Sequence, residues 1–144
     1  MLNRYRNGTL EIESNELAAD AEKWIVEARK NYESHQIQAA LVSIWGLVDR
    51  ANQYVEQTAP FKLAKQEDKA DRLNEVLYNL AESCRILAVL IWPVMPETAE
   101  KIFKQVGVEI LPNNFSQAKW GGLSKGHICN KPTPLFPRKD LEKK

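Results

Sequence analysis

Residues 68–92 read DKADRLNEVLYNLAESCRILAVLIW, and this stretch decides the fold. From Leu73 to Ile91, apolar side chains recur every three or four residues, which is the spacing of one helix face. The five residues before Trp92 are apolar on nearly every face, so we expect this end of the helix to be the most buried. Pro93 then ends or kinks the helix, because proline supplies no backbone donor and crowds the preceding turn.

Similar apolar stripes lie on either side of this helix. Two precede it, from about 14–32 and from 37–55, and a third covers 96–106 and stops at Gly107. Beyond Gly107 the periodicity disappears. The sequence therefore predicts one all-α domain over residues 1–144. We expect an antiparallel bundle of about four to five helices, with an irregular closing segment, 117–144, packed over it.

The four tryptophans divide into two groups. Trp24, Trp45 and Trp92 each lie on an apolar stripe, which predicts that they belong to the core. Trp120 lies on no stripe and is followed by Gly121-Gly122. That setting suits a ring held at the surface, where its flat face can stack on another flat group.

Composition indicates a soluble globular chain. Of the 144 residues, 44% are hydrophobic and 27% are charged, which excludes a disordered chain. The longest apolar run, 86–95, is broken by Pro93 and is shorter than the roughly 18 residues that span a bilayer. The first residues lead into polar sequence and do not resemble a signal peptide. We therefore expect a cytoplasmic location and no membrane contact.

The net charge of +1 hides an asymmetry between the body and the tail of the chain. Residues 115–144 carry seven basic and two acidic side chains, whereas residues 1–114 carry thirteen basic and seventeen acidic ones. A basic tail permits contact with a polyanion. A solvated terminus explains the same pattern and is the simpler interpretation of charge alone.

Residues that could perform catalysis do not form a recognisable pattern. His35 and His127 are separated by most of the chain, and the two cysteines lack metal-ligand spacing. The acidic residues are scattered over the expected solvent faces of the helices. We therefore expect no catalysis, no cofactor and no metal site in this chain taken alone.

Four stretches of the chain are informative when they are taken together and in order, although each is weak by itself. They are LNR (2–4), ANQYVEQTAPFKLAK (51–65), LIWPVMP (90–96), and WGGL (120–123) followed by Gly126-His127 and KPTPLFPR (131–138). Together they touch the whole chain and resemble the anticodon-binding domain of methionyl-tRNA synthetase, a class I aminoacyl-tRNA synthetase. In the second stretch, Phe61 stands where the family commonly has tryptophan.

The resemblance implies a partner and two site residues. In that family the bundle reads the CAU anticodon of methionine tRNAs. By the match, Trp120 stacks on the first anticodon base, cytosine, and Arg4 corresponds to an arginine that contacts the anticodon from the first helix. Stacking of splayed bases on aromatic rings is a common mode of RNA loop recognition. From the sequence we expect Trp120→Ala to weaken RNA binding without lowering thermal stability.

The resemblance also implies a larger parent enzyme. We expect this chain to be a domain of a methionine–tRNA ligase, which charges tRNA with methionine using ATP. The Rossmann catalytic domain, with ATP and with zinc as a second candidate cofactor, would lie in another part of the same polypeptide. One departure is that the family's asparagine, four residues before the arginine at Arg4, would precede residue 1.

Two alternatives stay open at this point. The first is the equivalent domain of another class I synthetase, for valine, isoleucine, leucine or cysteine, although we do not expect the Trp-Gly-Gly and Leu-Phe-Pro-Arg closure there. The second is a helical protein-interaction module that inserts Trp120 into a partner's pocket. Preference for a CAU stem-loop over one with its first anticodon base changed would separate an anticodon reader from such a module.

Overall fold

A computed structural model describes residues 2–108, 115–131 and 135, apart from the side chains of Asn3 and Arg4. Helices dominate this part of the chain, as the sequence predicts. They are α1 (Leu2–Arg6), α2 (Ala18–Glu33), α3 (Ile37–Thr58), α4 (Pro60–Leu63), the 3₁₀ turn η1 (Glu67–Lys69), α5 (Ala70–Ile91), α6 (Pro96–Val106) and the 3₁₀ turn η2 (Phe115–Gln117).

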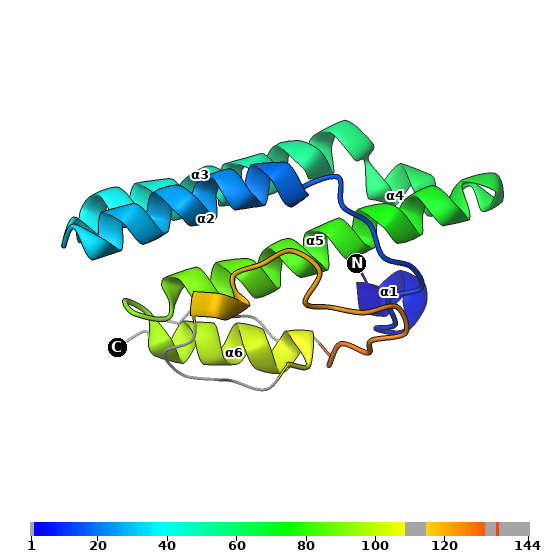
Figure 1. The fold of residues 1–144 in the computed structure, drawn as a ribbon. Coiled ribbons are helices and arrows are strands. Elements are labelled where there is room, and N and C mark those ends of the chain that lie inside the picture. Colours follow the sequence, from blue (N-terminus) through cyan, green and yellow to red (C-terminus); the bar gives the residue numbers. More distant parts are fainter. Residues whose placement is uncertain (1, 109–114, 132–134, 136–144) are drawn as a thin grey trace, which may run out of the picture.

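The helices form an antiparallel bundle around α5 (Figure 1). α2 and α3 make a hairpin on one side of α5, and α6 runs back along its other side. Ala59 takes a left-handed conformation with φ of 45°, and Pro60 begins α4 directly after it. α4 and α1 both lie near the start of α5, where Arg6 of α1 bonds Asn74 and Ala70 (Figure 1). The predicted all-α bundle is confirmed.

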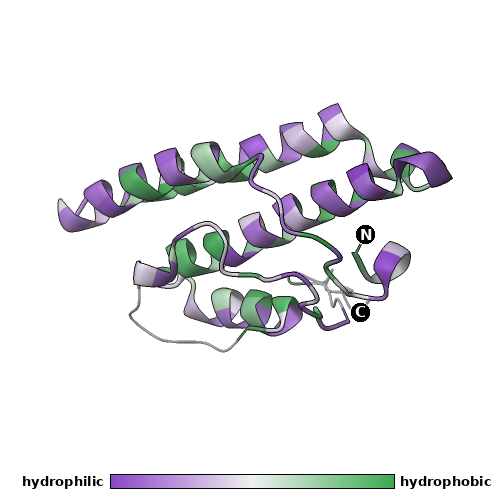
Figure 2. Cartoon of the chain, turned by 45° about the vertical axis from the view of Figure 1, so that its right-hand side comes forward, coloured by the Kyte–Doolittle hydropathy of each residue, from purple (hydrophilic) through white to green (hydrophobic). Residues whose placement is uncertain are grey.

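Apolar residues of four helices meet between the hairpin and the α5–α6 pair (Figure 2). The last turns of α5 are buried, as predicted, and Trp24 and Trp92 are partly buried against this cluster. The prediction for Trp45 is wrong, because its side chain is 51% exposed. Ile44 faces the core, and the next residue on a helix lies about 100° further round, which turns Trp45 outward.

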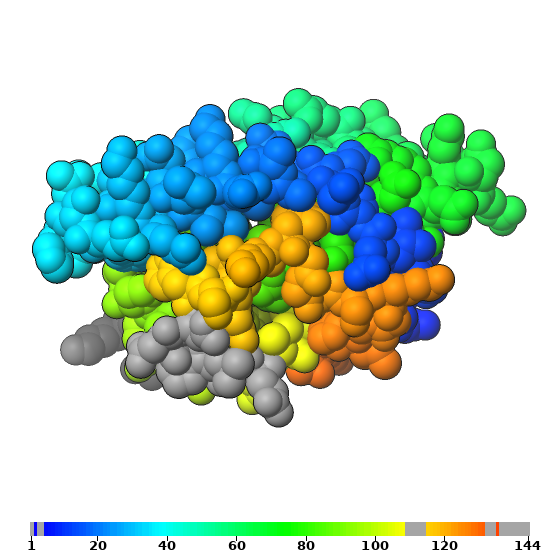
Figure 3. All heavy atoms as spheres, in the orientation of Figure 1, coloured from blue at the N-terminus to red at the C-terminus, as the bar shows by residue number. Residues whose placement is uncertain are grey.

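The closing segment lies across the bundle and pairs with the start of the chain (Figure 3). The Leu10 N–H donates to the His127 carbonyl at 2.9 Å, and the Gly126 N–H donates to the Leu10 carbonyl at 2.7 Å. An isolated antiparallel bridge joins Thr9 to Ile128. The predicted packing over the bundle is thus seen for residues 117–131, whereas most of 132–144 lies outside the described residues.

In the described part of the chain, no helix combines the length and the apolar character that a membrane span requires.

Candidate nucleic-acid interface

The ring of Trp120 is half-buried rather than open to solvent. Its indole N–H donates a 2.7 Å hydrogen bond to the backbone carbonyl of Ser14, in the stretch that leads into α2. The Trp120 ring makes an edge-to-face contact with the ring of Tyr78 on α5, with the ring centroids 6.4 Å apart and an interplanar angle of 67°. The indole nitrogen is therefore already bonded within the protein.

Trp120 also connects separate parts of the interior. Its ring packs against three buried apolar clusters that the described residues form. One of these clusters consists of Leu17, Tyr54 and Val76, and Leu63 of α4 packs against it as well. Trp120 and α4 thus rest on the same group of buried side chains.

A pocket of about 290 Å³ lies beside Trp120. Arg85, Lys119, Gly121 and Gly122 contribute to its lining together with the ring. This volume is just below the range of small-ligand sites, which begins at about 300 Å³. Trp120 is therefore partly exposed beside a pocket, although its N–H is bonded within the protein.

The turn after Trp120 is held by a buried carboxylate. Glu82 of α5 is fully buried, and its two oxygens accept hydrogen bonds from three successive backbone amides. The N–H groups of Gly121 and Gly122 donate to Oε1 at 3.0 and 2.9 Å, and the N–H of Leu123 donates to Oε2 at 3.2 Å. These bonds satisfy a charge that would otherwise be costly to bury.

Arg85, one helical turn later, pairs with this carboxylate and holds the other side of the turn. Its Nε donates to Glu82 at 3.0 Å, its Nη1 donates to the Gln117 carbonyl at 2.8 Å, and its Nη2 donates to the Lys119 carbonyl. The guanidinium lies so close to Gly122 that a Cβ at this position would overlap it. Gly121 has φ of +93°, with open space where a Cβ would stand.

These contacts revise the reason for the glycine pair. In the sequence, Gly121-Gly122 served to indicate that the Trp120 ring lies at the surface. The structure shows that Gly122 makes room for Arg85, whereas Gly121 supplies a backbone conformation that other residues rarely adopt. Neither Glu82 nor Arg85 was singled out from the sequence. The sequence signal that could have found them is a pair of charged residues, three apart, on a largely apolar part of α5.

Tyr78 and Asn79 of α5 make further side-chain hydrogen bonds that hold the closing segment and the stretch around Ser14. The Tyr78 hydroxyl donates to the Leu123 carbonyl at 2.6 Å, and burial raises its pKa to about 12. The Asn79 amide donates to the Ser14 hydroxyl at 2.8 Å, while its oxygen accepts from the Leu17 N–H at 3.0 Å. α5 thereby fixes both partners of the Trp120–Ser14 hydrogen bond.

Arg4 lies on α1, and its side chain is outside the described part of the structure. The helix itself is held against α5 by Arg6, whose Nε donates to the Asn74 side chain and whose Nη2 donates to the Ala70 carbonyl at 3.4 Å. α1 is therefore anchored near the start of α5. The predicted role of Arg4 stays a prediction.

Phe61 is a second aromatic residue at the surface, and the sequence did not mark it as a candidate site residue. Its side chain is 51% exposed on α4, beside the exposed Lys62. Pro60, directly before it, is buried, so the short helix is anchored while the ring faces outward. The position of Phe61 within the PFKL motif was visible in the sequence, but its exposure was not.

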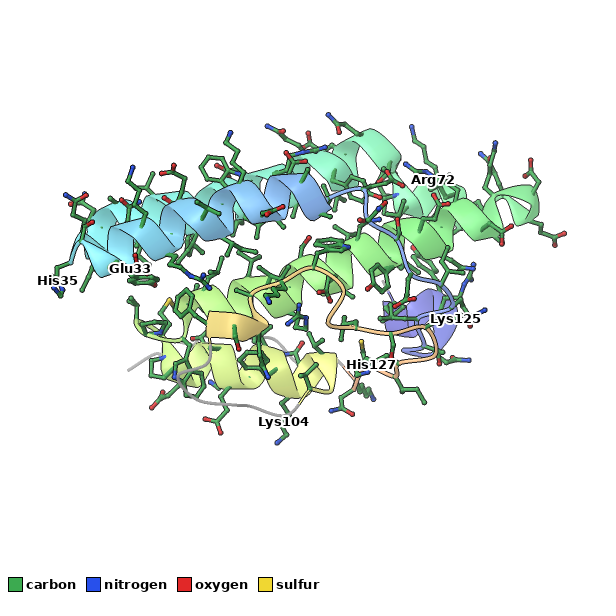
Figure 4. All side chains as sticks on the ribbon, viewed as in Figure 1. Glu33, His35, Arg72, Lys104, Lys125 and His127 are labelled. Carbon is green, nitrogen blue, oxygen red and sulfur yellow. The ribbon has the colours of Figure 1, made fainter. Side chains whose placement is uncertain are left out.

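The histidines occupy separate places in the fold (Figure 4). His35 has φ of 58° at the turn between α2 and α3, and His127 makes a 2.7 Å hydrogen bond to the Val106 carbonyl. In the described part of the chain, groups of three or more His, Cys, Asp or Glu side chains suited to holding a metal ion are absent.

Comparison with solved structures defines the class of protein. The fold superposes on the apo form of methionyl-tRNA synthetase from Mycobacterium tuberculosis with a TM-score of 0.83 and 32% sequence identity, covering 98% of this chain and 30% of the other. The same enzyme in complex with methionyl-adenylate gives a TM-score of 0.82 and 33% identity, covering 96% of this chain and 28% of the other. The chain thus has the architecture of a helical domain of an aminoacyl-tRNA synthetase.

Sequence comparison then gives the family. Residues 6–143 match the anticodon binding domain of methionyl tRNA ligase, and the chain belongs to this family. A methionine–tRNA ligase from Caldanaerobacter subterraneus is 38% identical over 99% of this chain and 23% of the relative. The Bacillus subtilis enzyme is 39% identical over 88% of this chain and 19% of the relative. The chain therefore spans less than a quarter of these relatives.

These matches favour the methionyl family over both alternatives, the equivalent domain of another class I synthetase and a helical protein-interaction module.

Proposed function

We propose that this chain binds the anticodon loop of methionine tRNA and prefers the anticodon CAU. Membership of the anticodon-binding family supports the loop as the target. The structural observation that carries the proposal is the outward-facing ring of Phe61, which is 51% exposed at the end of the bundle where α1 also lies (Figure 1). An exposed ring on an anchored turn is a suitable platform for a splayed base.

Trp120, the ring predicted from the sequence, is the second candidate platform. Its support is its partial exposure and the pocket that adjoins it. Because the indole N–H is bonded to Ser14, Trp120 would meet a base through its ring rather than through a hydrogen bond. Phe61 has the larger free surface, so we assign it the stronger contact, with Trp120 and Arg4 as further candidates.

The charges near these rings suit moderate binding that depends only weakly on salt. Lys62 and Lys65 are exposed around α4, and Lys119 and Lys125 are exposed on the closing segment. The Arg85 charge, in contrast, is paired with Glu82 and directed to backbone carbonyls. A few lysines near phosphates give a shallow dependence of affinity on salt, since each released counterion adds about −0.7 to −0.9 to the slope.

In this proposal the chain supplies specificity to a larger enzyme. The ATP-dependent attachment of methionine to tRNA would be carried out by a catalytic domain of the same polypeptide, which would also hold ATP and the candidate zinc. This chain would need no cofactor of its own. Binding of the anticodon would select the correct tRNA for the distant reaction.

Titration of the 144-residue chain with two RNA stem-loops tests the proposal. One carries the CAU anticodon, and the other has its first anticodon base changed within the same stem. We expect the CAU loop to bind roughly tenfold or more tightly, since a stacked base contributes about 1–3 kcal/mol. Equal affinity for the two loops would contradict anticodon recognition by this chain.

A further inference from the structure

The ion pair between Glu82 and Arg85 is unusual in its depth. The two side chains are 0% and 4% exposed, and they lie three residues apart in the middle of α5. Burying such a pair costs desolvation energy, so an apolar pair of the same volume is often equally stabilising or more so. Stability of the bundle is therefore a weak explanation for these charges.

Among the described residues, the further hydrogen-bond partners of the pair lie in one short turn of the closing segment. Glu82 accepts from the amides of residues 121–123, and Arg85 donates to the carbonyls of Gln117 and Lys119. All five groups belong to the backbone. Together they fix the path of the chain on both sides of Trp120, whose ring then reaches Ser14 and Tyr78.

We propose that Glu82 and Arg85 are positioning residues for RNA binding, because they hold the 117–123 turn in the one conformation that seats Trp120. We call the Glu82–Arg85 pair and its five backbone bonds the clamp. Trp120, which the clamp holds in place, packs against the cluster of Leu17, Tyr54 and Val76. Leu63 of α4 packs against the same cluster. Release of the turn would loosen both the pocket beside Trp120 and the support of α4. This inference rests on the function proposed above.

The clamp can be observed first without RNA. In the wild-type chain, the amide hydrogens of Gly121, Gly122 and Leu123 should exchange with solvent as slowly as those of the buried turns of α5. In the double variant Glu82→Gln/Arg85→Gln, which leaves no unpaired buried charge, these three amides should lose protection while the helical circular dichroism is kept. Rapid exchange in the wild type, or retained protection in the variant, would overturn the inference.

RNA binding then tests the positioning role. For the double variant we expect at least tenfold weaker binding of the CAU stem-loop and a smaller ratio between the CAU and changed loops, measured where the variant is folded. Glu75→Gln is the matched control, because Glu75 pairs with Arg72 at the same spacing on the same helix but is 41% exposed. It should leave both the affinity and the ratio unchanged.

The outcomes separate this inference from the proposed function. If the variant loses amide protection but keeps its affinity and ratio, the clamp is structural only and the inference fails, while anticodon recognition stands. If the wild-type chain itself does not distinguish the two loops, the proposed function fails and the inference fails with it.

Discussion

The indole N–H of Trp120 donates to the backbone carbonyl of Ser14, 106 residues earlier in the chain, at 2.7 Å. This bond joins the closing segment to the residues that lead into α2, across the middle of α5. The Asn79 side-chain amide donates to the Ser14 hydroxyl, and the Tyr78 hydroxyl donates to the Leu123 carbonyl. Side chains of α5 therefore hold both of the segments that the Trp120–Ser14 bond joins.

The Trp120–Ser14 bond predicts graded losses of stability at position 120. Trp120→Phe keeps a ring but leaves the Ser14 carbonyl without this donor, so we expect a loss of about 1 kcal/mol in the free energy of unfolding. Trp120→Ala also removes the packing against three clusters and should cost about 3 kcal/mol. Urea unfolding of the three proteins measures both values.

This expectation replaces the one drawn from the sequence, that Trp120→Ala would leave thermal stability unchanged. If the alanine variant unfolds at the wild-type urea concentration, the half-buried placement of the ring is wrong.

Phe61→Ala should separate binding from stability. Its ring is 51% exposed, so its removal should change the free energy of unfolding by less than about 1 kcal/mol. Affinity for the CAU stem-loop should fall roughly tenfold, because a stacking platform is lost. Trp45→Ala is a matched control, since Trp45 is also 51% exposed but lies on the outer face of α3. Equal effects of the two variants on RNA affinity would remove Phe61 from the site.

The two glycines after Trp120 should respond differently to alanine. At Gly122 a methyl group would overlap the Arg85 guanidinium, which cannot move without losing its bonds to Glu82, Gln117 and Lys119. We expect Gly122→Ala to cost about 2–3 kcal/mol. Gly121→Ala meets open space and should cost about 1 kcal/mol, from its positive φ alone.

Chemical denaturation of the two glycine variants gives the comparison directly. A larger loss for Gly121→Ala than for Gly122→Ala would contradict the close approach of Arg85 to the turn.

Tyr78 makes the stability of the chain sensitive to alkaline pH. Burial raises the pKa of its hydroxyl from 10.0 to about 12, so the folded state retains the proton at pH values where the unfolded state releases it. Its contribution is complete below pH 10 and is lost as the pH rises from 10 to 12. Tyr78→Phe should lower stability at pH 8 by about 1 kcal/mol, through the lost bond to Leu123.

Urea unfolding at pH 8 and pH 11 provides the test. The variant should lose less stability than the wild type between these two values. Because the pKa of Tyr54 is also raised to about 12, both proteins should still lose some stability. Parallel losses would show that folding does not raise the pKa of the Tyr78 hydroxyl.

The helices could be predicted from the sequence because their apolar spacing is local information. The stripe from Leu73 to Ile91 and the break at Pro93 correspond to the end of α5 and the turn before α6. Trp45 shows the limit of this reasoning. An apolar residue at the margin of a stripe is placed by the neighbouring helix, and here that neighbour leaves it exposed.

The seat of Trp120 could not be predicted, because it depends on contacts between residues far apart in sequence. Ser14 is 106 residues away, and Glu82 binds amides 39 to 41 residues later. A carboxylate within an amphipathic helix is normally expected on the solvent face, and its burial is explained by the backbone amides of the turn together with Arg85. The exposure of Phe61 likewise follows from how Pro60 and α4 are anchored.

A direct competition between the two stem-loops for the wild-type chain tests the central claim most directly. The CAU loop and the loop with its first anticodon base changed are mixed at equal concentration and one salt concentration, and the bound fractions are measured. Anticodon recognition predicts that the CAU loop occupies the chain in roughly tenfold or greater excess. Equal occupancy would show that this bundle binds RNA, if at all, without reading the anticodon.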